Sequence, residues 1–253
     1  MVYAFVINMA LKRPDRRRHM ANLMSEMGWR DYEFIEPFEK DVKDPDAANT
    51  SLRNTIVRLI FPRAAELGLD YFVVFEDDVM QMDGTRGKTI DTIDKLVIEA
   101  NEIAWDMIYL EYCLEVCSLG MRVSSGLQEA VTPFCAAAIL FNGSSLFKIA
   151  DCLATYPYPM SFAYSTCIRE GRVRALVASP PLFAQDVIMQ GDLNHGGVHW
   201  YLNWIFKMYD PLADKSKPRL PHCVDSASVL QYLTGFFWLV LSIVVFFVLA
   251  WKF

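Results

Sequence analysis

The sequence predicts an α/β domain, in which a mostly parallel β-sheet is flanked by helices, followed by one C-terminal transmembrane helix. Short apolar runs bounded by charged residues are typical of buried parallel strands. Amphipathic segments alternate with those runs, as expected when helices cover both faces of a sheet. The chain also carries no charged residue between Ser226 and Trp251, a run long enough to cross a bilayer.

The predicted elements follow one another in a regular order. Gly28 and Gly68 are expected to end the first two helices, and Pro62 to kink or break the second. Ligands bind such sheets at the carboxyl ends of the strands, so Asn8 and residues 76–78 should lie at the binding edge. We expect strands over residues 2–8, 71–75, 107–110, 136–141 and 173–178, and helices over 15–27, 51–67, 89–104 and 144–153.

The composition divides the chain into three parts. Residues 1–213 form the α/β domain, residues 214–226 a linker rich in proline and charge, and residues 227–253 the membrane anchor. A buried core helix as long as this anchor would normally show a polar stripe. The formal net charge of -6 at pH 7 argues against a nucleic-acid partner.

The six cysteines form no Cys-x-x-Cys pair, and several lie in apolar runs. This pattern favours reduced cysteines in the core, which suits a domain on the cytosolic side of a membrane. The sequence alone leaves disulfides open.

Three consecutive acidic residues, Glu76, Asp77 and Asp78, follow the second predicted strand. Clustered carboxylates raise one another's pKa unless a cation lies among them. Mg²⁺ or Mn²⁺ prefers such oxygen ligands. Side chains alternate along an extended segment, so Glu76 and Asp78 should converge on one metal ion while Asp77 points elsewhere. The alternative is a solvated acidic turn.

The segment 12–18, KRPDRRR, places several cations at the start of the first predicted helix. Asp15 can cap this helix, but Arg16 and Arg17 would then crowd a first turn that disfavours positive charge. A bound anion such as a nucleotide diphosphate would relieve this conflict. We therefore take Arg13, Arg16 and Arg17 as candidate cofactor-binding residues, with a basic surface patch as the alternative. Asn8, Glu76 and Asp77 at the strand ends complete this candidate set, Glu76 either on the ribose or on the metal.

His195 and His199 lie in the glycine-containing segment NHGGVHW. The two glycines argue against a helix there, so the spacing of the histidines does not define a metal site by itself. His199 is kept as a candidate third metal ligand beside Asp78 and Glu76. The chain contains no Gly-x-Ser-x-Gly, P-loop or zinc-binding cysteine set, which leaves hydrolase, ATPase and zinc-finger functions unsupported.

Several segments together resemble glycosyltransferase family 25, the lipopolysaccharide and procollagen galactosyltransferase family, whose members also occur in large DNA viruses. The resemblance runs from about residue 6 to 192 and depends on the order and spacing of its pieces. They are VINMALKRPDRRRHM, SLRNTIVRLIFPRAAELGLDYFVVFEDDV, WDMIYL, AAAILFNGSSLFKIADCL and PPLFAQDVIMQGDL. The resemblance implies a GT-A-like catalytic domain that uses Mn²⁺ and a nucleotide sugar, often UDP-galactose.

The chain departs from the family pattern at two places. Ser51 is followed by Leu52, where the family usually has Ser-His, and residues 162–165 lack an aspartate that is common there. These departures motivate a rival function, an inactive membrane-anchored binding protein that partners another glycosyltransferase. A nucleotidyltransferase, which shares the fold and the metal, is a third possibility.

The resemblance implies inversion at the sugar, so a carboxylate must take the proton of the acceptor hydroxyl. Asp192 matches the family's closing motif and is the first candidate, with Glu111 and Asp186 as alternatives near predicted strand ends. The acceptor would be a glycan, glycolipid or glycoprotein hydroxyl.

The apolar run and its flanks predict a tail-anchored protein with the domain in the cytoplasm. Lys215, Lys217 and Arg219 lie on the domain side, against Lys252 beyond the run, and positive charge favours the cytoplasmic side. A lumenal domain is the competing topology. Asn49-Thr-Ser and Asn142-Gly-Ser are acceptor motifs for N-glycosylation that would report on it.

Overall fold

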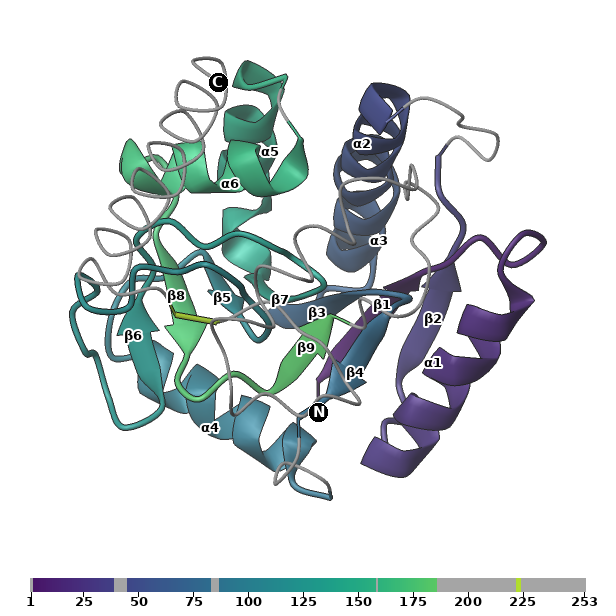
Figure 1. The fold of residues 1–253 in the computed structure, drawn as a ribbon, viewed down its shortest axis with the longest axis horizontal. Coiled ribbons are helices and arrows are strands. Elements are labelled where there is room, and N and C mark those ends of the chain that lie inside the picture. Colours follow the sequence, from purple (N-terminus) through teal and green to yellow (C-terminus); the bar gives the residue numbers. More distant parts are fainter. Residues whose placement is uncertain (1, 39–44, 83–86, 158, 186–221, 224–253) are drawn as a thin grey trace, which may run out of the picture.

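The fold is a mixed β-sheet between two layers of helices, shown in Figure 1. The computed structural model describes residues 2–38, 45–82, 87–157, 159–185 and 222–223. The strands are β1 (Tyr3–Ile7), β2 (Tyr32–Ile35), β3 (Tyr71–Glu76), β4 (Val79–Gln81), β5 (Met107–Tyr109), β6 (Leu127–Glu129), β7 (Ala138–Asn142), β8 (Ala175–Ala178) and β9 (Phe183–Gln185). The helices are α1 (Pro14–Met27), α2 (Pro45–Asn54), the π-helical η1 (Thr55–Ile60), α3 (Phe61–Glu66), α4 (Thr89–Ala100), the 3₁₀ turn η2 (Gly143–Ser145), α5 (Leu146–Thr155) and α6 (Met160–Arg169).

The main sheet has seven strands in the order β2-β1-β3-β7-β5-β8-β6. The pairs β1–β2, β1–β3 and β5–β8 are parallel. Strand β7 runs antiparallel to both β3 and β5, and β6 runs antiparallel to β8. The predicted mostly parallel sheet is therefore confirmed, with β7 and β6 reversed. Because β3 and β5 both oppose β7, their carboxyl ends lie at the same edge.

Both faces of the sheet are buried, which explains why the central strands are nearly continuous apolar runs. Helices α1 and α4 cover one face, where Met20, Met24 and Ile93 pack against Val73 and Phe75. The opposite face lies under η1, α3, α5 and α6 and is rich in aromatic residues. Figure 1 shows α1 and α4 on one side of the sheet and α2, α3, α5 and α6 on the other.

Three predicted helices differ in their bounds. The helix expected over 51–67 begins at Pro45 and passes through the π-helical turn η1 just before Pro62, which lies in the first turn of α3. The helix expected over 89–104 ends at Ala100, because the chain must turn there for Trp105 to enter the core before β5. The helix expected from residue 144 starts at Leu146, after the turn η2. The first helix ends as expected, with Gly28 in the left-handed conformation at φ 71°.

All six cysteines are paired, which corrects the expectation of reduced core cysteines. The disulfides are Cys113–Cys135, Cys117–Cys223 and Cys152–Cys167. The apolar surroundings that suggested free thiols equally suit buried half-cystines, and the partners are brought together only by the fold. Disulfides persist in oxidising compartments, so the cysteines no longer support a cytosolic domain.

Alkylation of the denatured protein tests this pairing. We expect iodoacetamide to modify no cysteine before reduction and all six after reduction, as measured by intact mass. Rapid acid quenching of the starting material controls for oxidation during preparation. Modification of several cysteines without a reductant would contradict the pairing.

The predicted transmembrane segment and linker lie outside the described residues, apart from His222 and Cys223. Within the part of the chain that the structure describes, no helix combines the length and apolar character needed to cross a bilayer.

Candidate active site

The polar residues predicted at strand ends meet at one edge of the sheet. Asn8 follows β1, the acidic triplet begins at the last residue of β3, and Glu111 lies two residues beyond β5. Asn8, Asp77, Asp78 and Glu111 are buried, whereas Glu76 is half-buried. This carboxyl edge is where ligands bind in sheets of this kind, and we call it the carboxyl-edge site.

Asp77 is held by two buried donors. The Arg16 guanidinium donates from Nη1 to Asp77 Oδ1 at 2.6 Å, and Asn8 Nδ2 donates to Asp77 Oδ2, also at 2.6 Å. Arg16 lies in the first turns of α1 and is only 5% exposed. The pair therefore joins α1 to the end of β3, and both oxygens of Asp77 are satisfied within the protein.

Asp78 is held less completely than Asp77. Its Oδ2 accepts from Gln185 Nε2 at 3.1 Å and lies 3.8 Å from Arg16 Nη2. Its Oδ1 is buried without a hydrogen-bond partner, and so is Asn8 Oδ1. The orientation of the Asn8 amide is fixed, because its Nδ2 already donates to Asp77 and to the Arg13 carbonyl. Two buried acceptors at this edge thus lack a donor or a cation.

Glu76 points to the opposite side of the sheet from Asp77. It lines a small cavity on the face covered by η1 and α6, together with Ile7, Val74 and Tyr164. The expected alternation ends after Glu76, because Asp77 and Asp78 form the turn between β3 and β4. Asp77 and Asp78 therefore share Arg16, and Asp77 does not point away from Asp78 as the extended pattern predicted.

Backbone contacts tie Glu111 to the acidic triplet. The Ala137 N–H donates to Glu111 Oε2 at 3.0 Å, and the Ala137 carbonyl accepts from the Glu76 N–H at 2.8 Å. Burial raises the pKa of Glu111 to about 8, and the nearby carboxylates of Glu76 and Asp78 add to the shift. Burial also raises the pKa of Glu76 to about 8, with further contributions from Asp78 and Asp77.

Burial and the neighbouring donors shift the pKa of Asp78 in opposite directions. Burial raises its pKa, whereas the Arg16 guanidinium and the Gln185 amide favour the charged form and oppose the shift. Arg16 is thus a cation of the protein itself beside Asp77 and Asp78. The sequence pattern had suggested only a metal ion as the cation that offsets the clustered carboxylates.

We predict that Glu111→Gln changes how stability depends on pH. Between the usual carboxyl pKa of 4.5 and about 8, folded Glu111 keeps a proton that the unfolded chain releases. The free energy of unfolding should therefore fall as pH rises through this window. Urea unfolding should show the variant close to wild type at pH 5 and more stable than wild type at pH 8, because the glutamine cannot ionise.

The exposed Glu66, substituted as Glu66→Gln, is the matched control and should leave the pH dependence unchanged. Part of the decrease in unfolding free energy with pH should remain in Glu111→Gln, because burial raises the pKa of Glu76 as well. If the unfolding free energies of wild type and Glu111→Gln changed equally with pH, the raised pKa of Glu111 would be refuted.

The basic segment is satisfied largely within the protein. Arg13 pairs with Asp15 at 2.8 Å, and the Arg17 guanidinium lies 4.1 Å from the centre of the Phe34 ring. Asp15 does not occupy the N-cap, which is Arg13, and its pKa is lowered to about 2, chiefly by the hydrogen bond from Arg13. Arg16 and Asn8 contact Asp77, and Asn8 also donates to the Arg13 carbonyl, so the start of α1 lies beside the triplet; a diphosphate there stays a prediction.

Four predicted site residues lie outside the described residues. They are the base candidates Asp186 and Asp192, and the histidines His195 and His199. Among the residues that the structure does describe, no group of three or more His, Cys, Asp or Glu side chains could hold a metal ion. Any cation at Asp78 would therefore take most of its ligands from elsewhere.

Sequence reasoning missed Gln185. The two-stranded sheet β4–β9 pairs Val79 with Gln185 and so brings this amide to Asp78. Both strands are only three residues long, too short for a period to be recognised. The one signal was its place beside Asp186 in the segment that resembles the family's closing motif.

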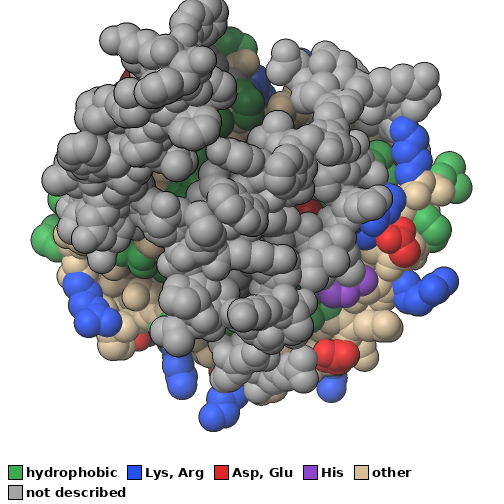
Figure 2. Space-filling view, viewed as in Figure 1, with side chains coloured by type: hydrophobic (Ala, Val, Ile, Leu, Met, Phe, Trp, Pro, Cys, Tyr) green, Lys and Arg blue, Asp and Glu red, His purple; other side chains and the backbone are tan. Residues whose placement is uncertain are grey.

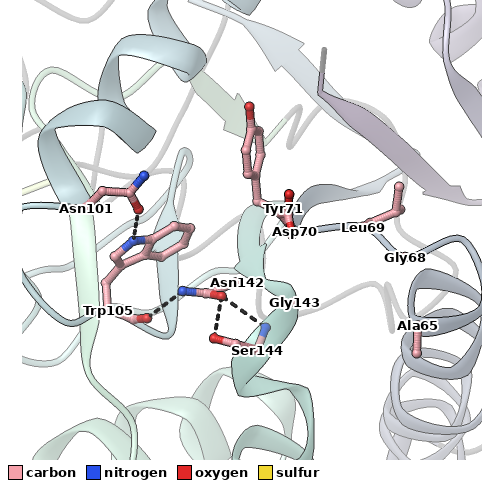
Figure 3. Close-up of a pocket in the computed structure, with 10 residues that line it drawn as sticks. All are labelled: Ala65, Gly68, Leu69, Asp70, Tyr71, Asn101, Trp105, Asn142, Gly143 and Ser144. Carbon is pink, nitrogen blue, oxygen red and sulfur yellow. Dashed lines mark hydrogen bonds between the residues drawn. The ribbon is translucent and has the colours of Figure 1, made fainter.

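A larger hollow of about 580 Å³ lies at the opposite edge of the sheet. Figure 3 shows Trp105, Asn142 and Ser144 joined by hydrogen bonds on one wall, with Ala65, Gly68 and Leu69 on the other. The Asn142 amide donates to the Trp105 carbonyl and accepts from Ser144, so its polar atoms are engaged. This hollow contains none of the strand-end carboxylates and is separate from the carboxyl-edge site.

The described surface shows no single basic patch on the face drawn in Figure 2. Lys and Arg side chains are spread around its rim, interrupted by acidic and apolar ones.

Comparisons with known proteins leave the family open. No family model matches the chain, and no curated protein sequence matches it. A solved glycosyltransferase involved in glycosylation of the major capsid of PBCV-1 is 13% identical over 75% of this chain and 94% of its own, with a TM-score of 0.46. UDP-glucose pyrophosphorylase complexed with UDP-glucose is 12% identical over 70% of this chain and 90% of its own, with a TM-score of 0.43.

A third solved structure, A197 from STIV, is 9% identical over 70% of this chain and 81% of its own, with a TM-score of 0.38. Similarities at these scores assign neither a family nor an activity to this chain. The resemblance to glycosyltransferase family 25 stays a prediction, and function has to be argued from the carboxyl-edge site.

Proposed function

We propose that this protein is a metal-dependent glycosyltransferase that moves a hexose from a nucleotide-diphosphate sugar to a hydroxyl group. The observation that carries the proposal is the pair of buried acceptors, Asp78 Oδ1 and Asn8 Oδ1, at the carboxyl edge of the sheet. An acceptor buried without a partner is costly, so a site that presents two of them is suited to a cation or a hydrogen-bond donor.

The residues present fit a hard divalent cation, Mn²⁺ or Mg²⁺. Such ions are commonly bound through one or two carboxylates, with the remaining ligands supplied by water and substrate phosphates. Asp78 Oδ1 and Asn8 Oδ1 are the two oxygens at this edge without a partner in the folded protein, and Glu76 stays the other predicted carboxylate ligand. When bound, the ion would supply positive charge that stabilises the departing diphosphate.

The protein's own residues supply the remaining contributions. Arg16 and Asn8 fix Asp77 and so hold the start of α1 against the end of β3. Arg13, at the N-terminal end of α1, lies beside the position where a diphosphate would approach the helix. The family resemblance suggests a UDP-sugar as the donor, with galactose favoured.

In an inverting transfer, the acceptor oxygen bonds to the anomeric carbon as the bond from that carbon to the diphosphate oxygen breaks. The hydroxyl proton must pass to a carboxylate. Among the described residues, Glu111 is the candidate that lies at the same edge as the triplet. Asp192 and Asp186 remain candidates from the resemblance.

A donor screen tests the proposal. The full chain is incubated with UDP-, GDP- and dTDP-sugars and Mn²⁺, and release of the nucleoside diphosphate is measured with and without an acceptor hydroxyl. We expect turnover with one class of donor, and loss of turnover in EDTA. Turnover of a nucleoside triphosphate and a sugar phosphate to pyrophosphate would instead favour a nucleotidyltransferase. Donor binding without turnover would favour the inactive binding protein.

The proposal also includes a membrane anchor over residues 227–253. It further includes the side of the membrane on which the domain lies. The disulfides favour the lumenal topology that the sequence analysis left as the competitor of a cytoplasmic domain. Asn49 and Asn142 both lie in acceptor motifs for N-glycosylation and report on this topology. An endoglycosidase-sensitive mass shift at Asn49 in a eukaryotic host would identify a lumenal domain.

A further inference from the structure

Residues 222 and 223 are held on the domain by covalent and hydrogen bonds, and we call them the exit point because the predicted anchor follows them in the sequence. Cys223 is joined to Cys117 by a disulfide with a Cα–Cα distance of 5.4 Å. The Glu115 N–H donates to the His222 carbonyl at 2.9 Å, and His222 Nδ1 contacts the Tyr112 carbonyl oxygen at 2.8 Å. The yellow segment in Figure 1 marks residues 222–223.

The segment that holds this exit point begins at the carboxyl-edge site, because it follows Glu111 directly in the sequence. Tyr112 directly follows Glu111, and Cys117 is six residues beyond Glu111. A chain spans at most ~3.6 Å per residue, so Cys117 is within about 22 Å of Glu111. The apolar run that begins at Ser226 starts three residues after Cys223, within about 11 Å of it.

Two large apolar side chains project from the loop that holds this exit point. Leu119 is 68% exposed and Met121 is 64% exposed. Their backbone is ordered by hydrogen bonds: the Leu119 N–H donates to the Val116 carbonyl, and the Met121 carbonyl accepts from the Glu129 N–H, both at 2.9 Å. Gly120 lies between them and accepts from the Gln128 side chain at 3.1 Å. The two apolar residues are thus presented outward on a held turn, which we call the 119–121 turn.

We propose that the 119–121 turn rests in the headgroup region of a lipid bilayer and that the carboxyl-edge site therefore works on an acceptor held at the membrane surface. The run without charge after Ser226 is suited to enter the bilayer. A run that starts within about 11 Å of Cys223 places the membrane surface close to the Cys117–Cys223 disulfide. Apolar side chains beside a membrane entry point gain by burial at the headgroup boundary, whereas in water they would stay exposed. The membrane anchor and the class of acceptor in this inference rest on the proposed function, whereas the exposure of the 119–121 turn does not.

Photo-crosslinking to lipid tests the contact. The full chain, reconstituted in phosphatidylcholine vesicles, carries p-benzoylphenylalanine at Leu119 or Met121. The matched control carries it at Phe147, which is 91% exposed on α5, next to the opposite end of the sheet. After irradiation, intact mass should show at least about tenfold more lipid adduct at 119 and 121 than at 147, since only the former enter the interface. Equal adduct at all three positions, or none at 119 and 121, would overturn the proposal.

Activity separates this inference from the proposed function. We expect Leu119→Asp with Met121→Asp to lower transfer to a bilayer-held acceptor several-fold, while transfer to a soluble acceptor and donor hydrolysis stay at wild-type levels. Equal loss on both acceptors would contradict a membrane-surface role. Lipid adducts at 119 and 121 in a protein that turns over no nucleotide sugar would refute the proposed function and leave the membrane contact standing.

Discussion

Asp78→Asn should reduce sugar transfer by about 10²–10³-fold or more, the range found when one electrostatic contact to a developing charge is removed. The substitution keeps the size of the side chain and can still receive the hydrogen bond from Gln185. It removes the negative charge next to Oδ1, the oxygen that has no partner in the folded protein. We therefore expect loss of cation and donor binding with a melting temperature close to that of the wild type, measured by calorimetry and by steady-state turnover.

Asp70→Asn is the matched control, because this exposed aspartate precedes the other end of the same strand β3. It should bind the donor and turn it over at the wild-type rate. Full activity in Asp78→Asn, or full wild-type activity in the presence of EDTA, would contradict the proposed role of Asp78.

Arg16→Met should destabilise the fold by about 3–5 kcal/mol, the cost typical of breaking a buried ion pair by removing one partner. The methionine fills part of the same space but leaves Asp77 buried beside Asp78 without its cation. Two negative charges would then lie close together, with the Asn8 amide still donating to Asp77. Urea unfolding at neutral pH measures the loss.

Arg17→Met is the control on the same helix. The Arg17 guanidinium lies over Phe34, a contact worth about 0.5–1 kcal/mol at an exposed site. Equal losses in the two variants, or an Arg16→Met protein more stable than the wild type, would contradict the account of Arg16. Added Mn²⁺ should restore part of the stability of Arg16→Met, because a cation among the carboxylates replaces the missing guanidinium charge.

The central elements could be predicted because their signals are local. Strands β1 and β3 are uninterrupted apolar runs, and α1 combines an apolar face with a terminal glycine. Strand β2 was missed because YEFI is only four residues long, contains Glu33, and is half-buried throughout at the edge of the sheet. Strands β4, β6 and β9 have three residues each and carry no readable period.

The site was predictable as a place but not as a set of contacts. The carboxyl ends of parallel strands share one edge, so the sequence pattern predicts that Asn8, the triplet and Glu111 lie together. The pairing of Arg16 with Asp77 spans 61 residues of sequence, and only the packing of α1 against the sheet brings the two together. The same applies to the disulfides, whose partners are 15, 22 and 106 residues apart and follow from tertiary structure alone.

Binding of Mn²⁺ measured by electron paramagnetic resonance tests the central claim most directly. Free Mn²⁺ gives a strong signal that weakens when the ion binds, so the full chain can be titrated in the presence of UDP. We predict uptake of one Mn²⁺ per chain by the wild type and by Asp70→Asn, and no comparable uptake by Asp78→Asn. Absence of uptake by the wild type, or equal uptake by Asp78→Asn, would contradict a cation-dependent nucleotide-sugar site at the carboxyl edge.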